Sequence, residues 1–204
     1  MSSEEQREAA EAEVDALVAR AVEGDRQAFG ELFELKRGLV FRVALHQLGD
    51  PEEARQVTQT VFVRLWNSLD RYDPSRRLDT WLYRVAINAA IDHHRRQAPR
   101  RREREIDETL SGGLEDERAR PALEGGLQND EIQRVLLELC ELLGPKQRAA
   151  FLLREVEGHP TSEVAQTLDS TESTVRNHVA QARRILQRAL RERYPEYAPV
   201  ENPT

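Results

Sequence analysis

Apolar residues recur at intervals of three and four along two stretches of the chain, residues 14–97 and 128–194, and this spacing is typical of helices. Ala, Leu, Glu, Arg and Gln, which favour helices, are abundant, whereas the 204 residues include only 10 Gly and 9 Pro. Residues 98–127 are highly charged, contain two Gly-Gly pairs and lack this spacing. We therefore expect an all-α fold with two small helical domains, a flexible linker at 98–127, an acidic tail at 1–13 and a short tail at 195–204.

Capping residues divide the first domain into separate helices. Asp25 can cap a helix that Gly49 ends, and the preceding helix ends at Gly24. Asp50 can cap the next helix, in which Pro51 takes the first position and Glu53 the third. The expected helices span residues 14–24, 25–48, 50–69 and 80–96, with a loop at 70–79. The last of them is apolar except for one polar stripe, made of Arg84, Asn88, Asp92 and Arg95.

The second domain carries a helix-turn-helix pattern. We expect helices at 129–143, 145–157, 161–168 and 172–193, with a tight turn at Asp169-Ser170 and Thr171 capping the last helix. A helix that follows such a turn, with polar and basic residues near its start, fits the DNA major groove. The alternative is a helical hairpin with a solvated basic face. The candidate DNA contacts are Ser173, Thr174, Arg176, Asn177, His178, Gln181 and Arg184.

Charge is distributed very unevenly along the chain. The net charge is −7, yet residues 95–104 and residues 176–193 each contain six arginines and one glutamate. Residues 1–15 contain six acidic residues and one arginine. Two basic clusters on an acidic chain favour DNA contact at two places and a protein partner elsewhere.

Other functional classes find little support in the sequence. No nucleophile-base pair, phosphate-binding loop or Cys/His cluster is present, so we expect neither an enzyme nor a metal or cofactor site. The first residues are acidic and polar, and no apolar run approaches the roughly 20 residues of a membrane span. We expect a cytoplasmic protein without membrane insertion, in which Cys140 is a buried apolar residue.

The motifs of both domains resemble those of one protein family. DPEEA, RLW, YDP, TWLYRVAIN and DHHRR resemble region 2 of the extracytoplasmic-function sigma factors, and LLGPKQRAAFLLREVEG with the helix-turn-helix resembles region 4. The resemblance implies an alternative sigma factor that binds core RNA polymerase and directs it to promoters with specific −35 and −10 elements. It implies as partners the coiled coil of the largest polymerase subunit, the flap of the second-largest subunit, promoter DNA and an anti-sigma factor.

The same resemblance assigns roles to residues of the first domain. Polymerase contacts are expected at Gln56, Gln59, Phe62 and Arg64. Recognition and melting of the −10 element are expected from Tyr72, Arg76, Arg77, Trp81, Tyr83, Arg84, Asn88, Arg95 and Arg96. The seven candidates of the second domain would read the −35 element.

Two alternatives remain open from the sequence. One is a helix-turn-helix regulator that binds DNA without being a polymerase subunit. The other is a degenerate paralogue that sequesters a partner, because Arg55, Gln56 and Thr60 stand where the family usually has acidic residues.

Overall fold

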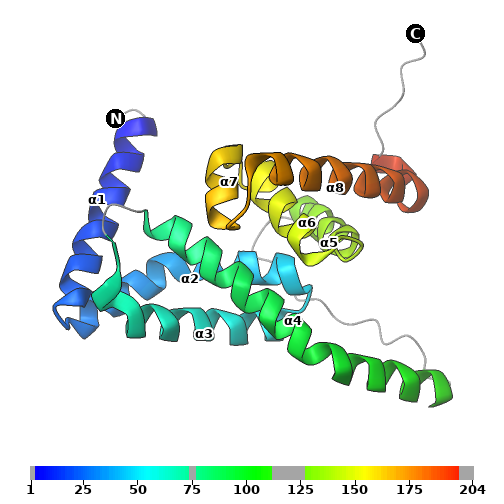
Figure 1. Ribbon diagram of the computed structural model, residues 1–204, viewed down its shortest axis with the longest axis horizontal. Helices are drawn as coiled ribbons and strands as arrows, with labels where there is room; N and C mark the ends of the chain where they lie inside the picture. The colour runs from blue at the N-terminus through cyan, green and yellow to red at the C-terminus, as the bar shows by residue number, and fades with distance from the viewer. Residues whose placement is uncertain (1–2, 74–76, 112–126, 198–204) are drawn as a thin grey trace, which may run out of the picture. The chain divides into compact units, whose positions relative to one another are not determined.

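Helices account for almost all of the structure, a computed structural model that describes residues 3–73, 77–111 and 127–197 (Figure 1). No strand is present within these ranges, which confirms the all-α class. The chain divides into two compact units, the first made of residues up to 45 and 52–93, and the second of 46–51 and the residues from 94 onward.

The first unit contains three helices and the first half of a fourth. These are α1 (Ser3–Val22), α2 (Arg26–Leu48), α3 (Pro51–Ser68) and α4 (Leu78–Ser111), with a short 3-10 turn, η1 (Leu69–Arg71), after α3. Asp25 caps α2 as expected, because its Oδ1 accepts hydrogen bonds from the backbone N–H groups of Gln27 (2.9 Å) and Ala28 (3.0 Å). Gly49 follows α2 with a φ of 72°, in the left-handed region that glycine adopts without strain.

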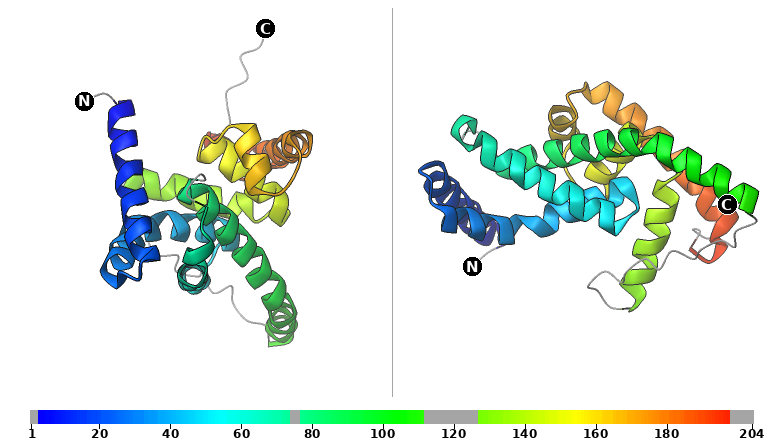
Figure 2. Two further views of the ribbon diagram at one scale, coloured as in Figure 1. Left: turned by 60° about the vertical axis from the view of Figure 1, so that its left-hand side comes forward. Right: turned by 90° about the horizontal axis from the view of Figure 1, so that it is seen from below.

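Two aromatic pairs fix how α2 and α3 pack. Phe29 meets Trp66 edge to face at 4.8 Å between ring centroids, and Phe33 meets Phe62 in the same way at 4.7 Å. From the first pair to the second, the residue number increases on α2 and decreases on α3. The two helices therefore run antiparallel, as Figure 2 also shows. Leu32 of α2, Leu65 of α3, and Leu82 and Ile87 of α4 are almost fully buried. On α2 the most buried residues include Ala28 and Leu32, whereas Phe29, Phe33 and Leu39 are only half-buried.

Two helices extend beyond the boundaries expected from the sequence. α1 begins at Ser3, so the expected tail at 1–13 is helical from residue 3, and α4 continues to Ser111, inside the expected linker. Both additions are rich in Glu and Arg, which favour helices, and an existing helix extends at little cost because its nucleus is already formed. Neither addition has the apolar spacing on which the sequence prediction depends. The linker residues 112–126 lie outside the described residues.

The second unit contains the helix-turn-helix. Its helices are α5 (Leu127–Cys140), α6 (Pro145–Phe151), α7 (Thr161–Thr167) and α8 (Glu172–Arg193), with a π-helical turn, η2 (Leu152–Val156), after α6 and a 3-10 turn, η3 (Pro195–Tyr197), after α8. The expected helix at 145–157 is therefore an α-helix for only its first two turns. Residues 195–197 of the expected C-terminal tail form η3.

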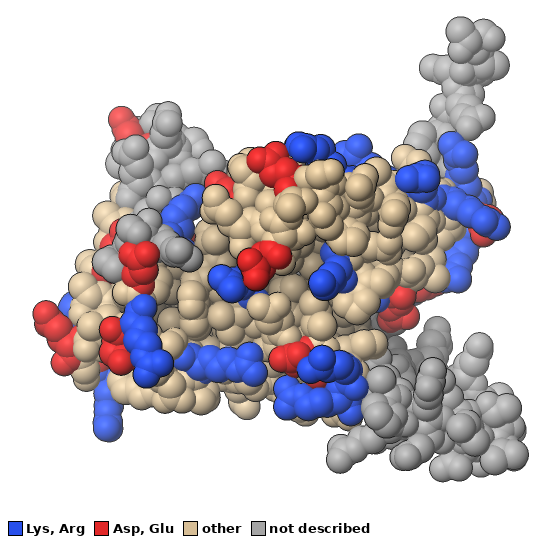
Figure 3. Space-filling model, viewed as in Figure 1, with Lys and Arg blue, Asp and Glu red and all other residues tan. Residues whose placement is uncertain are grey.

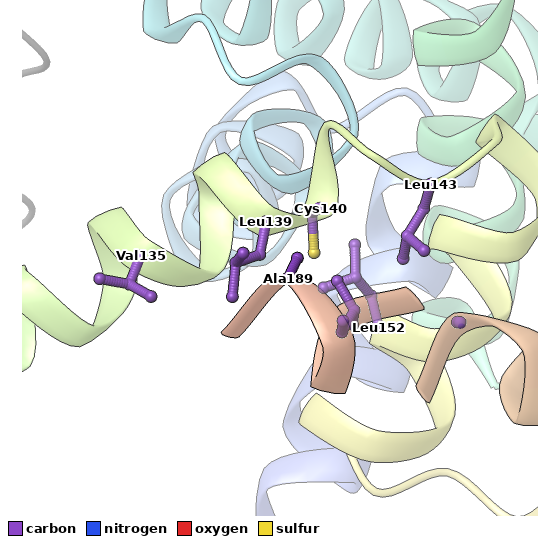
Figure 4. Packing of buried hydrophobic residues seen from close by; sticks show 8 residues of the cluster. Val135, Leu139, Cys140, Leu143, Leu152 and Ala189 are labelled. Atoms are coloured by element: carbon purple, nitrogen blue, oxygen red, sulfur yellow. The ribbon is translucent and has the colours of Figure 1, made fainter. Parts of the chain in front are cut away.

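A single apolar cluster holds α5, η2 and α8 together. Figure 4 shows Leu139 and Cys140 of α5 facing Ala189 of α8 and Leu152 of η2. Cys140 is only 1% exposed, as expected for a buried apolar residue. Burial raises the pKa of its thiol to about 11, so the thiol is protonated and unreactive near neutral pH.

Candidate nucleic-acid interface

The turn between α7 and α8 has the geometry that the sequence predicted. Asp169 adopts a φ of 49°, in the left-handed region, and α8 begins three residues later. Thr171 caps α8, because its hydroxyl accepts a hydrogen bond from the backbone N–H of Thr174 at 3.2 Å. These two local features place the first turns of α8 next to α7 and confirm the helix-turn-helix prediction (Figure 1).

The outward face of α8 carries most of the predicted DNA contacts. Five of the seven candidates are exposed: Ser173, Arg176, Asn177, Gln181 and Arg184. Thr174 and His178 are half-buried, and the Thr174 hydroxyl is paired with that of Thr171 at 2.9 Å. The inward face is apolar, with Val175, Val179, Ala182 and Leu186 buried.

Arg176 is paired with an acidic neighbour on the surface of α8. Its guanidinium lies 3.1 Å from the carboxylate of Glu172, one helical turn earlier, and both side chains are largely exposed. An exposed pair of this kind contributes at most a few tenths of a kcal/mol. Arg176 can therefore exchange this partner for a base or a phosphate at little cost.

Two side-chain contacts that the sequence did not reveal fix α8 against the elements before it. Arg183 donates to the Glu155 carboxylate of η2, with the Nη2 hydrogen bond at 2.5 Å. Gln147 of α6 donates its amide Nε2–H to Oε1 of Gln181 at 2.7 Å. Both contacts join residues that are far apart in the sequence, so no local pattern signals them.

The C-terminal end of α8 is tied to α5. The Tyr194 hydroxyl donates a 2.5 Å hydrogen bond to Glu138, whose other carboxylate oxygen lies 3.4 Å from Arg193. The hydrogen bond to Glu138 raises the pKa of Tyr194. Lys and Arg side chains gather over this end of α8 (Figure 3), where Arg184, Arg188 and Arg191 follow one another along one exposed face at intervals of four and three. Such a row suits the phosphates that flank a recognised sequence.

A second polar face lies on α4 in the first unit. Arg84, Asn88 and Arg95 of the predicted stripe are exposed, and Arg96 lies beside them. Arg77 is exposed, Trp81 and Tyr72 are half-buried, and Arg76 lies outside the described residues. Burial, followed by the nearby charge of Asp15, raises the pKa of Tyr72 to about 12.

Two predicted contact residues belong to the core instead. Tyr83 is 6% exposed on the inward face of α4, and Phe62 is 4% exposed and packs on Phe33. Both α3, which carries Phe62, and α4, which carries Tyr83, have apolar residues on more than one side. The sequence therefore does not show which aromatic ring faces inward. Tyr83 is therefore not an exposed stacking surface, and Phe62 is not an exposed polymerase contact.

The outward face of α3 retains the other three predicted polymerase contacts. Gln56, Gln59 and Arg64 are exposed. Val63 is 59% exposed and Trp66 is 39% exposed on the same helix. Val63 and Trp66 therefore add exposed apolar area beside the polar side chains of this face.

Nothing in the described residues points to a metal site or a membrane span. No group of three or more His, Cys, Asp or Glu side chains in them is placed to hold a metal ion. None of the described helices is long and apolar enough to cross a bilayer.

Comparison with known proteins identifies the family. The helix-turn-helix and its polar face define a DNA-binding protein. The family model of sigma-70 region 2 matches residues 32–100, and the family model of sigma-70 region 4 matches residues 131–186. The chain belongs to the sigma-70 family of RNA polymerase sigma factors, in its extracytoplasmic-function group.

Individual relatives agree in sequence and in fold. The chain is 25% identical over 188 residues to the ECF RNA polymerase sigma factor SigW of Bacillus subtilis, a match that covers 86% of this chain and 95% of that protein. The fold resembles CnrH, solved in complex with the cytosolic domain of CnrY, with a TM-score of 0.63 and 24% identity over 89% of this chain and 99% of the other. It also resembles RpoE of Bartonella quintana, solved with the anti-sigma factor NepR, with a TM-score of 0.58 and 21% identity over 80% and 96% of the two chains.

Proposed function

We propose that this chain is an alternative sigma factor that binds core RNA polymerase and directs it to promoters through two DNA-contacting faces. The observation that carries the proposal is the outward face of α8, where Ser173, Arg176 and Asn177 are exposed in the first turns after a helix-turn-helix turn. Arg and Asn are the side chains that most often read base edges in the major groove. In this proposal α8 reads the −35 element.

The exposed face of α4 is proposed to act on the −10 element. Arg84, Asn88, Arg95 and Arg96 form a polar and basic surface that suits an opened DNA strand. Trp81 is half-buried and can offer an aromatic face for a base, whereas Tyr83 supports the helix from inside.

The outward face of α3 is proposed to bind polymerase. Gln56, Gln59 and Arg64 supply hydrogen-bond donors and acceptors, and Val63 and Trp66 supply exposed apolar area next to them. The acidic residues common in the family are absent here, so apolar contact takes a larger share of the binding. The protein partners are the coiled coil of the largest polymerase subunit and the flap of the second-largest subunit.

An anti-sigma factor is proposed as the controlling partner. The solved relative CnrH was captured with the cytosolic domain of CnrY, and the solved relative RpoE was captured with the anti-sigma factor NepR. The proposed role places the protein in the cytoplasm, with polymerase and the chromosome, as a regulatory subunit rather than an enzyme.

Binding to core polymerase tests this proposal. A fluorescently labelled full-length chain should form a saturable complex with core polymerase, measured by anisotropy, and another sigma factor should displace it. Val63→Glu should weaken the complex about tenfold or more, because it places a charge in a proposed apolar contact. Glu34→Gln, on the exposed face of α2, is the control. A chain that binds promoter-like duplex DNA tightly but never binds polymerase would instead be a helix-turn-helix regulator.

A further inference from the structure

The hydrogen bonds around Gln147 determine which end of the Gln181 side chain faces outward. A glutamine side chain carries an accepting oxygen on one side of its amide group and a donating nitrogen on the other, and the two ends can exchange by rotation. When a neighbour fixes one end, the opposite chemistry is presented to a ligand. Gln181 is one of the exposed residues on the face of α8 proposed to read DNA.

The first step of this arrangement is at the start of α6. Gln147 occupies the third helical position after Gly144, and its Oε1 accepts a hydrogen bond from the Gly144 backbone N–H at 3.3 Å. A backbone N–H can only donate, so the atom that faces it must be the oxygen of Gln147. The orientation of the Gln147 amide group is thereby set, with its nitrogen pointing away from Gly144.

The second step connects α6 to α8. The Nε2–H of Gln147 donates to the side-chain oxygen of Gln181 at 2.7 Å. With its oxygen engaged in this way, Gln181 keeps its amide nitrogen and both N–H groups for a ligand. Asn177 and Arg184 lie one turn before and one turn after Gln181 on the same exposed stripe, so Gln181 belongs to the face of α8 that carries the other proposed base contacts.

We propose that Gln181 reads a guanine of the −35 element as a hydrogen-bond donor, and that Gln147 is the positioning residue that gives it this polarity. Guanine presents two acceptors in the major groove, N7 and O6, which match two outward N–H groups. Cytosine presents an amino donor there, which would meet these N–H groups without forming a hydrogen bond. Adenine presents an acceptor and a donor side by side, and a glutamine reads it with both the oxygen and the nitrogen of its amide group. The contact with Gln147 engages the oxygen of Gln181 and so hinders this way of reading adenine.

The inference rests on the proposed function, and one substitution separates it from a purely structural role of Gln147. In Gln147→Glu the carboxylate still accepts the Gly144 N–H and keeps the cap of α6, because glutamate is equally suited to this position. Its second oxygen, however, can only accept. Gln181 must then turn its N–H groups toward position 147 and present its oxygen to DNA, which favours the amino group of cytosine.

The experiment is a pair of selections from DNA libraries randomised across the −35 element. One selection uses the full chain bound to core polymerase, and the other uses the full chain alone on duplex DNA at low salt. We expect the wild type to prefer guanine over cytosine about fivefold or more at one position in both selections. Gln181→Ala should remove this preference, and Gln147→Glu should shift it toward cytosine.

Gln187→Glu is the matched control, because it adds the same charge on an exposed part of α8 away from Gln147. It should weaken binding to all sequences and leave the guanine preference in place. An unchanged guanine preference in Gln147→Glu would overturn the positioning role, and an unchanged preference in Gln181→Ala would overturn the reading of guanine by this residue. Failure of the sigma-factor proposal gives a different result, namely no promoter selection with polymerase and a retained guanine preference on duplex DNA alone.

Discussion

Removing the cap of α8 should loosen the proposed recognition helix by a predictable amount. Thr171 accepts the backbone N–H of Thr174 at 3.2 Å, and Thr171→Ala leaves that N–H without its partner. Loss of a side-chain cap of this kind typically costs about 1 kcal/mol, which corresponds to about a fivefold larger population of the opened helix start. For a domain of this size the same loss lowers the melting temperature by about 4–8 °C.

Amide hydrogen exchange is the assay that isolates this effect. Trp66 and Trp81 both lie in the first unit, so tryptophan fluorescence does not report on α8. Peptides that cover residues 171–182 should exchange about five times faster in Thr171→Ala than in the wild type, while peptides of α3 should not change.

Thr171→Asp is the matched variant. Aspartate is a good cap and its charge suits the start of a helix, so exchange in residues 171–182 should match the wild type or be slower. DNA binding should nevertheless weaken, because the new charge lies next to the proposed phosphate and base contacts. Equal exchange rates in wild type and Thr171→Ala, or fast exchange in Thr171→Asp, would refute the capping argument.

Three further changes test other parts of the structure. Asp169→Gly should raise the unfolding free energy of the second unit by about 0.5–1 kcal/mol in urea denaturation, because glycine adopts the positive φ of 49° without strain, and no gain would contradict this. Cys140 should resist alkylation at pH 8 until denaturant is added, and rapid labelling of the native protein would exclude a buried thiol. Its pKa of about 11 in the folded protein lies above the value of about 8.5 in an unfolded chain. The stability that its burial provides is therefore complete below about pH 8.5 and is lost as the pH rises through 11. Arg176→Ala should reduce transcription about fivefold or more on promoters with a matching −35 element and much less on promoters without one, and equal losses on both would show that Arg176 does not read bases.

The sequence predicts well what local chemistry determines. The caps at Asp25 and Thr171 and the tight turn at Asp169-Ser170 depend on a few neighbouring residues, and all three are confirmed. The polar stripe of α4 was also recognisable, because Arg84 and Asn88 would be costly to bury without partners.

The burial of individual side chains and the contacts between helices could not be predicted from the sequence, because they depend on how the helices pack. Phe62 and Tyr83 are buried and Trp66 is partly exposed, and only the positions of the neighbouring helices decide which ring faces inward. The contact between Gln147 and Gln181 joins residues 34 positions apart, so no pattern within either helix predicts it.

Promoter opening by the reconstituted polymerase complex tests the central claim most directly. Core polymerase and the full-length chain would be incubated with a promoter library, and the opened sequences would be recovered after single-strand-specific modification with permanganate. The proposed function predicts opening on a subset of sequences that share a −35 and a −10 element, with none when the chain is omitted. The absence of opening on every sequence, with a chain that is folded and a polymerase that is active with another sigma factor, would contradict it.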